Sequence, residues 1–93
     1  MKSAYELAME RLAKTAPLKQ LTPEQLANIR EIDSIFTARI AERETLVQSQ
    51  IAEARTAGSL ENVRMLQETL AQEVRKLREE CEERKEKVRQ AAG

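Results

Sequence analysis

The sequence predicts an all-α protein whose body is a long antiparallel helical hairpin, or coiled coil, preceded by a short N-terminal helix. Charged residues make up 34% of the 93 residues and aromatic residues only 2%, a composition typical of long helices and coiled coils. Glycine and proline occur only twice each, so each of them marks a boundary between segments. The low aromatic content leaves little bulk for a compact globular core.

Residues 1–22 are expected to form the short helix and a connector. Ser3 to Glu6 match a capping box, in which the serine oxygen accepts a backbone N–H and the glutamate reaches back to the cap. A helix therefore begins near Ala4. Pro17 disfavours helical geometry at the residue before it, so this helix ends at about residue 15 or 16.

Residues 23–93 are expected to form the hairpin. Thr22 and Gln25 make a second capping box, with Pro23 between them at the first helical position. No helix breaker follows until Gly58. The spacing predicts a helix of about 35 residues, which is a rod of roughly 50 Å.

The turn is expected at residues 57–59. Gly58 suits the left-handed conformation that ends many helices, because it has no Cβ. Ser59 can then cap a third helix, which continues without a breaker to about Gln90. Two long helices joined by so short a turn fold back on each other.

A simple rule predicts the register of this hairpin. In an antiparallel pair with its turn at Gly58 and Ser59, facing residues have numbers that sum to 117. Apolar residues meet at six levels: Ala54 with Val63, Ile51 with Leu66, Val47 with Leu70, Ile40 with Leu77, Phe36 with Cys81, and Ile29 with Val88.

The seam also contains polar residues. Asp33 falls opposite Arg84, which predicts a charge pair between the two helices. Arg43 falls opposite Val74 and is expected to extend its charged head outward along its aliphatic stem. At Cys81 we favour a buried structural thiol, because a reactive cysteine needs exposure and nearby positive charge.

Several apolar residues lie off the seam and indicate a candidate protein interface. On the second helix they are Ile32, Ile35 and Leu46, and Leu7 and Met65 lie off the apolar faces of the first and third helices. Unpaired apolar residues of this kind are typical of contact surfaces. We expect a homodimer, and the N-terminal helix is expected to dock over Ile32 and Ile35 in the same or the other copy.

Enzymatic activity, cofactors and metal ions are not expected. The chain has no histidine, no glycine-rich loop and no Cys-x-x-Cys pair, which removes the usual triads, phosphate cradles and zinc sites. Four adjacent glutamates near Cys81 lie on one helix, which cannot surround a cation. Their expected role is a solvated surface.

A nucleic-acid- or ribosome-associated factor is the alternative function. The net charge of zero gives no global attraction to nucleic acid or membrane. The basic end of the third helix, with Arg84, Lys85, Lys87 and Arg89, is the best local candidate. It lacks interleaved aromatic residues that would stack on bases, and it also suits a helix C-terminus.

The expected location is the cytoplasm. We find neither a signal-type N-terminus nor an apolar run of about 20 residues that would span a membrane. The single cysteine, Cys81, cannot form an internal disulfide, which agrees with a reducing compartment.

Two stretches resemble known proteins. The opening Lys2-Ser3-Ala4-Tyr5-Glu6-Leu7-Ala8-Met9-Glu10-Arg11-Leu12 resembles a group of short uncharacterised bacterial coiled-coil proteins. Residues 51–70 resemble the UVR-type helical hairpin, although Leu60 stands where that motif prefers phenylalanine and the arms here are longer. The second resemblance implies subunit contacts. Together with the composition, it favours a structural or adaptor protein that acts by helix-mediated contact.

Overall fold

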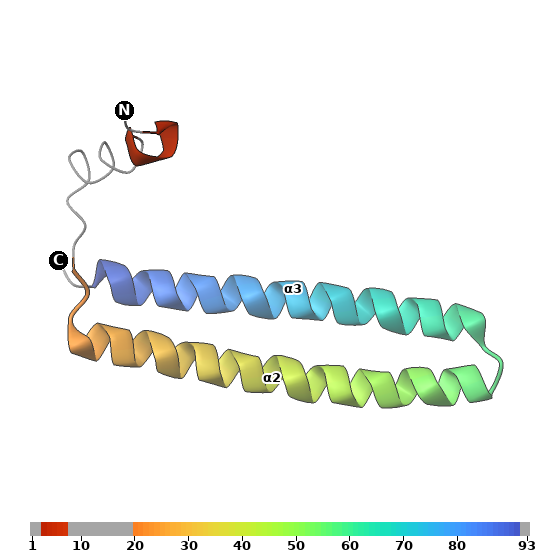
Figure 1. Cartoon of the computed structure of the whole chain (residues 1–93). Helices are drawn as coiled ribbons and strands as arrows, with labels where there is room; N and C mark the ends of the chain where they lie inside the picture. The colour runs from red at the N-terminus through yellow and green to blue at the C-terminus, as the bar shows by residue number, and fades with distance from the viewer. Residues whose placement is uncertain (1–2, 8–19, 92–93) are drawn as a thin grey trace.

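A computed structural model describes residues 3–7 and 20–91 of the chain. Two long helices dominate it, α2 from Pro23 to Thr56 and α3 from Leu60 to Gln90. They run antiparallel, side by side, and are joined by a short turn (Figure 1). The described residues contain no strand. The prediction of an all-α helical hairpin is confirmed.

The first turn of α2 is fixed by the predicted capping box. The Gln25 N–H donates to Thr22 Oγ1 at 3.1 Å, and the Thr22 N–H donates to Gln25 Oε1 at 2.8 Å. Gln25 also reaches across the hairpin, where its Nε2 donates to the carbonyl oxygen of Val88 at 3.0 Å. This contact, which the sequence did not reveal, ties the start of α2 to the end of α3.

The turn between the helices is a glycine-dependent helix ending. Gly58 has φ +73°, the left-handed conformation expected from its lack of a Cβ. The N–H groups of Gly58 and Ser59 donate to the carbonyl oxygens of Arg55 and Ala54, as in a Schellman motif. Ser59 occupies the cap position of α3, but its side chain makes no capping hydrogen bond. The predicted position of Ser59 at the start of α3 is therefore confirmed, and the predicted capping by its side chain is wrong.

The core is a single seam between the inner faces of α2 and α3. Its buried apolar side chains are Phe36, Val47, Ile51, Val63 and Cys81. Near the turn, Val47, Ile51 and Val63 form a cluster, with Ala54, Leu66 and Leu70 packed against it. These six residues make up the three predicted pairs closest to the turn, so the predicted register is confirmed there.

Of the expected N-terminal helix, the structure describes only the first turn. Residues 4–7 are helical, and the Glu6 N–H donates to Ser3 Oγ at 3.2 Å, as the serine half of the capping box predicts. The end of this helix, Pro17 and most of the connector lie outside the described residues. The predicted docking of this helix over Ile32 and Ile35 concerns these same residues and so also falls outside the described part of the chain. Neither long helix has an apolar stretch that could cross a membrane.

Candidate functional site

One side of α2 carries the candidate interface. Ile32, Ile35, Arg39, Glu42 and Leu46, here called the α2 stripe, follow one another at intervals of three and four residues. That spacing places them along one line of the helix, beside the seam. Ile35 is 40% exposed and Leu46 is 50% exposed, whereas Ile32 is partly buried. The stripe therefore has apolar ends and a charged middle.

Arg39 and Glu42 are the members of the stripe that sequence reasoning missed. Both are exposed, and neither forms an ion pair within the described residues. The Arg39 guanidinium carbon lies 5.1 Å from the centre of the Phe36 ring, within cation–π distance. The signal in the sequence was the eleven-residue interval between Ile35 and Leu46, in which Arg39 and Glu42 continue the steps of four and three residues with opposite charges.

Met65 extends the candidate interface onto α3. It is 59% exposed and borders a shallow depression together with Gln50 and Glu53 of α2. Gln50 and Glu53 follow Leu46 by four and seven residues, so they continue along the same side of α2. Leu46 and Met65 consequently share one side of the hairpin. Leu7 is half exposed, in the short N-terminal turn of residues 4–7.

An ion pair crosses the hairpin beside Leu46. Arg43 Nη2 lies 2.8 Å from Glu73 Oε1, and Arg43 Nε donates to the other carboxylate oxygen. Hydrogen bonds from Arg43 lower the pKa of Glu73 below its ordinary value. Arg43 does extend out of the seam as expected, but toward a specific partner on α3. Arg39 and Glu42, in contrast, form no ion pair within the described residues.

The predicted pairing of Asp33 with Arg84 is wrong. Asp33 pairs instead with Lys85, whose Nζ lies 2.9 Å from Asp33 Oδ1. Arg84 pairs with Glu80 at 2.9 Å and lies over the Phe36 ring. Side chains of successive helical residues point about 100° apart, so Lys85 and Arg84 turn to different sides of α3. Lys85 turns toward Asp33, on the side of the seam away from the stripe.

These cross-helix pairs predict a loss of stability in acid. A hydrogen bond from Lys85 is the main cause that lowers the pKa of Asp33, as Arg43 does for Glu73. As the pH falls, the Asp33 and Glu73 carboxylates are therefore protonated at a higher pH in the unfolded chain than in the folded one. The stabilisation from these two pairs is complete above about pH 5 and is lost as the pH falls through the lowered pKa values of the folded chain. We expect the urea midpoint to fall between about pH 6 and pH 3.

The matched variant is Asp33→Asn with Glu73→Gln. It should be less stable than the unmodified chain near neutral pH, and its midpoint should fall by less on acidification. An equal acid-induced loss in both proteins would show that these two carboxylates are not responsible.

The basic end of α3 is largely paired within the hairpin. Besides the Arg84 and Lys85 pairs, Arg89 Nη1 lies 3.1 Å from Glu86 Oε2. Lys85 also pairs with Glu82 at 2.7 Å, and its side chain is only 13% exposed. The hydrogen bonds that Lys85 donates to Glu82 and Asp33 raise its pKa. A phosphate group would therefore have to compete with carboxylates for Arg84, Lys85 and Arg89. Lys87 is the fourth candidate residue.

Cys81 is a buried thiol. Burial raises its pKa, and its Sγ donates a weak hydrogen bond to Asp33 Oδ1 at 3.6 Å. The thiolate that reacts with disulfide reagents is therefore disfavoured. We expect a chromogenic disulfide reagent at mildly alkaline pH to modify the folded chain at least about tenfold more slowly than the urea-unfolded chain. Equal rates would contradict the buried environment.

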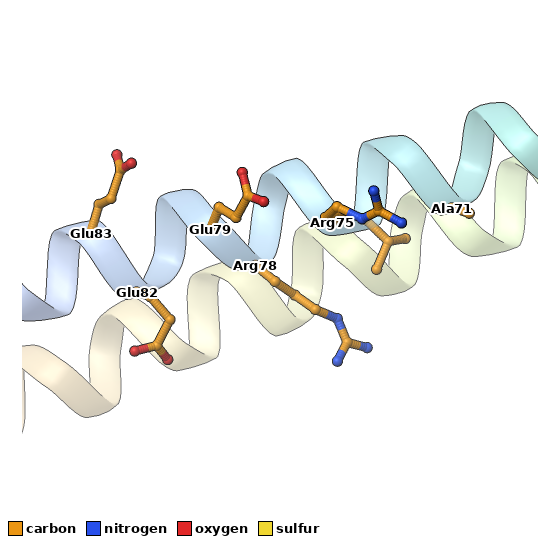
Figure 2. A pocket seen from close by; sticks show the side chains of 7 residues that line it. Ala71, Arg75, Arg78, Glu79, Glu82 and Glu83 are labelled. Atoms are coloured by element: carbon orange, nitrogen blue, oxygen red, sulfur yellow. The ribbon is translucent and has the colours of Figure 1, made fainter.

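A further depression lies on α3 alone (Figure 2). The side chains around it spread apart, with Glu79 and Glu83 pointing to one side of the helix and Arg78 and Glu82 to the other. Within residues 3–7 and 20–91, no three histidine, cysteine, aspartate or glutamate side chains are grouped to hold a metal ion. The depression is part of a charged, solvated surface.

No protein-family model, curated protein or solved structure matches this chain.

Proposed function

We propose that this chain is a non-enzymatic structural or adaptor protein that acts by helix-mediated contact with proteins, and that it associates with a second copy of itself. The observation that carries the proposal is the exposure of Ile35, Leu46 and Met65 on one side of the hairpin. Exposed apolar residues that gather along one side of a helix pair are typical of helix-packing surfaces.

The shape of the core supports the same function. Two helices side by side bury only their facing edges, and the buried apolar set described above is correspondingly small. A further layer of helices is the common way in which such a pair completes its core. The resemblance of residues 51–70 to the UVR-type hairpin points to subunit contacts as well.

The proposed location is the cytoplasm. Cys81 is a free thiol in the structure, and free thiols persist where the surroundings are reducing. The alternative function, a nucleic-acid- or ribosome-associated factor, has less support, because Arg84, Lys85 and Arg89 already pair with carboxylates.

Sedimentation equilibrium tests the proposed function. We expect the unmodified chain, of 10.6 kDa, to sediment at twice that mass at micromolar concentration. Ile35→Gln with Leu46→Gln removes the apolar ends of the stripe while keeping good helix formers, and this variant should sediment as a monomer.

The matched control is Leu26→Gln. Leu26 is 42% exposed, similar to Ile35, but lies seven residues before Asp33 and so follows the seam line of α2 instead of the stripe. This variant should remain dimeric. A monomeric unmodified chain with full helicity would contradict self-association, and loss of the dimer in the Leu26 variant would contradict the choice of face.

A further inference from the structure

Four of the five residues of the α2 stripe form a set that is complementary to itself when it is reversed. Ile35, Arg39, Glu42 and Leu46 are separated by four, three and four residues, so the set is symmetric about a point between Arg39 and Glu42. We propose that two copies pair antiparallel along α2 about a twofold axis through this point. Ile35 then faces Leu46 of the second copy, and Arg39 faces Glu42. This inference rests on the proposed function and specifies its partner and register.

Charge determines the direction of the pairing. Each facing pair has residue numbers that sum to 81, so the axis produces two Arg39–Glu42 contacts between opposite charges. A parallel arrangement would instead place Arg39 against Arg39 and Glu42 against Glu42. Like charges brought face to face oppose association. Both side chains are exposed and have no ion-pair partner within the described hairpin, so they are available for this contact.

Other antiparallel registers lose the match. If the numbers of facing residues instead sum to 74, Ile35 faces Arg39 and Ile32 faces Glu42. A sum of 78 places Arg39 against itself. Burying an aliphatic side chain against an unpaired charge is unfavourable, so the register with a sum of 81 is the one that satisfies both kinds of residue.

The position of the axis also lets nearly the whole of α2 overlap. Helix α2 extends from Pro23 to Thr56, and the proposed axis lies within one residue of its midpoint. Residues 25–56 of one copy therefore lie against the same range of the other, a contact about 48 Å long. An isologous dimer of this kind is closed, because both copies use the same surface.

The same axis brings the remaining apolar candidates together. In the hairpin register, Met65 is level with Ala52 of its own α2. The twofold axis makes Ala52 level with Ile29 of the second copy, less than one helical turn from Ile32. Met65 is therefore placed to cover the second copy's partly buried Ile32, and the two α3 helices flank the α2 pair.

Charge reversal tests this register. Arg39→Glu and Glu42→Arg each convert two attractive contacts into repulsive ones, and each should weaken the dimer at least about tenfold in sedimentation equilibrium. The double variant Arg39→Glu with Glu42→Arg restores opposite charges and should return to within a few-fold of the unmodified chain. Circular dichroism of each variant checks that the helices remain formed.

A mixture of the two single variants provides the sharpest comparison. Each variant carries like charges three residues apart on its own helix, and mixing cannot change that. Opposite charges meet only between the two chains, so the mixture should form a heterodimer more tightly than either variant forms a homodimer. If the unmodified chain is dimeric but charge reversal has no effect and the mixture shows no preference, this register is refuted and the proposed function stands. A monomeric unmodified chain overturns both.

Discussion

Replacing Phe36 by alanine is expected to lower the free energy of unfolding by about 3 kcal/mol or more. Phe36 is only 1% exposed and is the largest fully buried side chain among the described residues. The guanidinium groups of Arg39 and Arg84 lie over its ring, at 5.1 and 5.2 Å from the centroid. Truncation leaves a cavity and removes both cation–π contacts.

Urea denaturation followed by circular dichroism measures this loss, at equal protein concentration for each variant. Two controls bracket the result. Phe36→Leu retains much of the buried volume and should cost clearly less than alanine, and Thr37→Ala, at the exposed neighbouring position, should stay within about 0.5 kcal/mol of the unmodified chain. A Phe36→Ala midpoint equal to that of Thr37→Ala would contradict the placement of Phe36 in the seam.

Replacing Ile51 by alanine is expected to lower the free energy of unfolding by about 2 to 4 kcal/mol. Ile51 is buried in the cluster with Val47 and Val63 near the turn. Alanine removes three side-chain carbons from contacts that join α2 to α3, and the long helices have little freedom to close the space. The same urea measurement applies.

The controls for Ile51 follow the same logic. Ile51→Val removes one methylene group and should cost about 0.5 to 1.5 kcal/mol, while Gln48→Ala, on the exposed side of the helix, should have little effect. Phe36 and Ile51 are fifteen residues apart, or roughly 22 Å along α2. Their effects should add within about 0.5 kcal/mol. A cost for Ile51→Ala no larger than that of Gln48→Ala would place Ile51 outside the core.

The fold could be predicted largely because few residues interrupt the helices. The capping box at Thr22 marked the start of α2 correctly, and Gly58 marked the turn, because a positive φ at this position favours a residue without a Cβ. Between those signals, the apolar spacing of the two helices was compatible with one register. The structure confirms it in the cluster around Val47 and Ile51.

The polar contacts could not be predicted as well, for a geometric reason. The rule of constant sums gives the level at which two residues lie, but not the side of the seam to which each side chain turns. Lys85 and Arg84 differ by one residue and therefore by about 100°, and this difference decided which of them pairs with Asp33. The Arg43–Glu73 pair was missed for the same reason.

The candidate interface stays a prediction, and the structure adds only the exposure of its residues. Periodicity alone indicated Ile32, Ile35 and Leu46, and the structure places Ile35, Leu46 and Met65 exposed on one side. Arg39 and Glu42 are charged, so apolar periodicity does not indicate them, and their proposed role depends on a partner outside the chain.

The dependence of thermal stability on protein concentration tests whether a second copy completes the core of this hairpin. Association stabilises a folded dimer by mass action, so its melting temperature rises with concentration. We expect the midpoint, followed by circular dichroism, to rise by several degrees over about a hundredfold increase in concentration. One fully helical species with the same midpoint at every concentration would contradict completion of the core by a second copy.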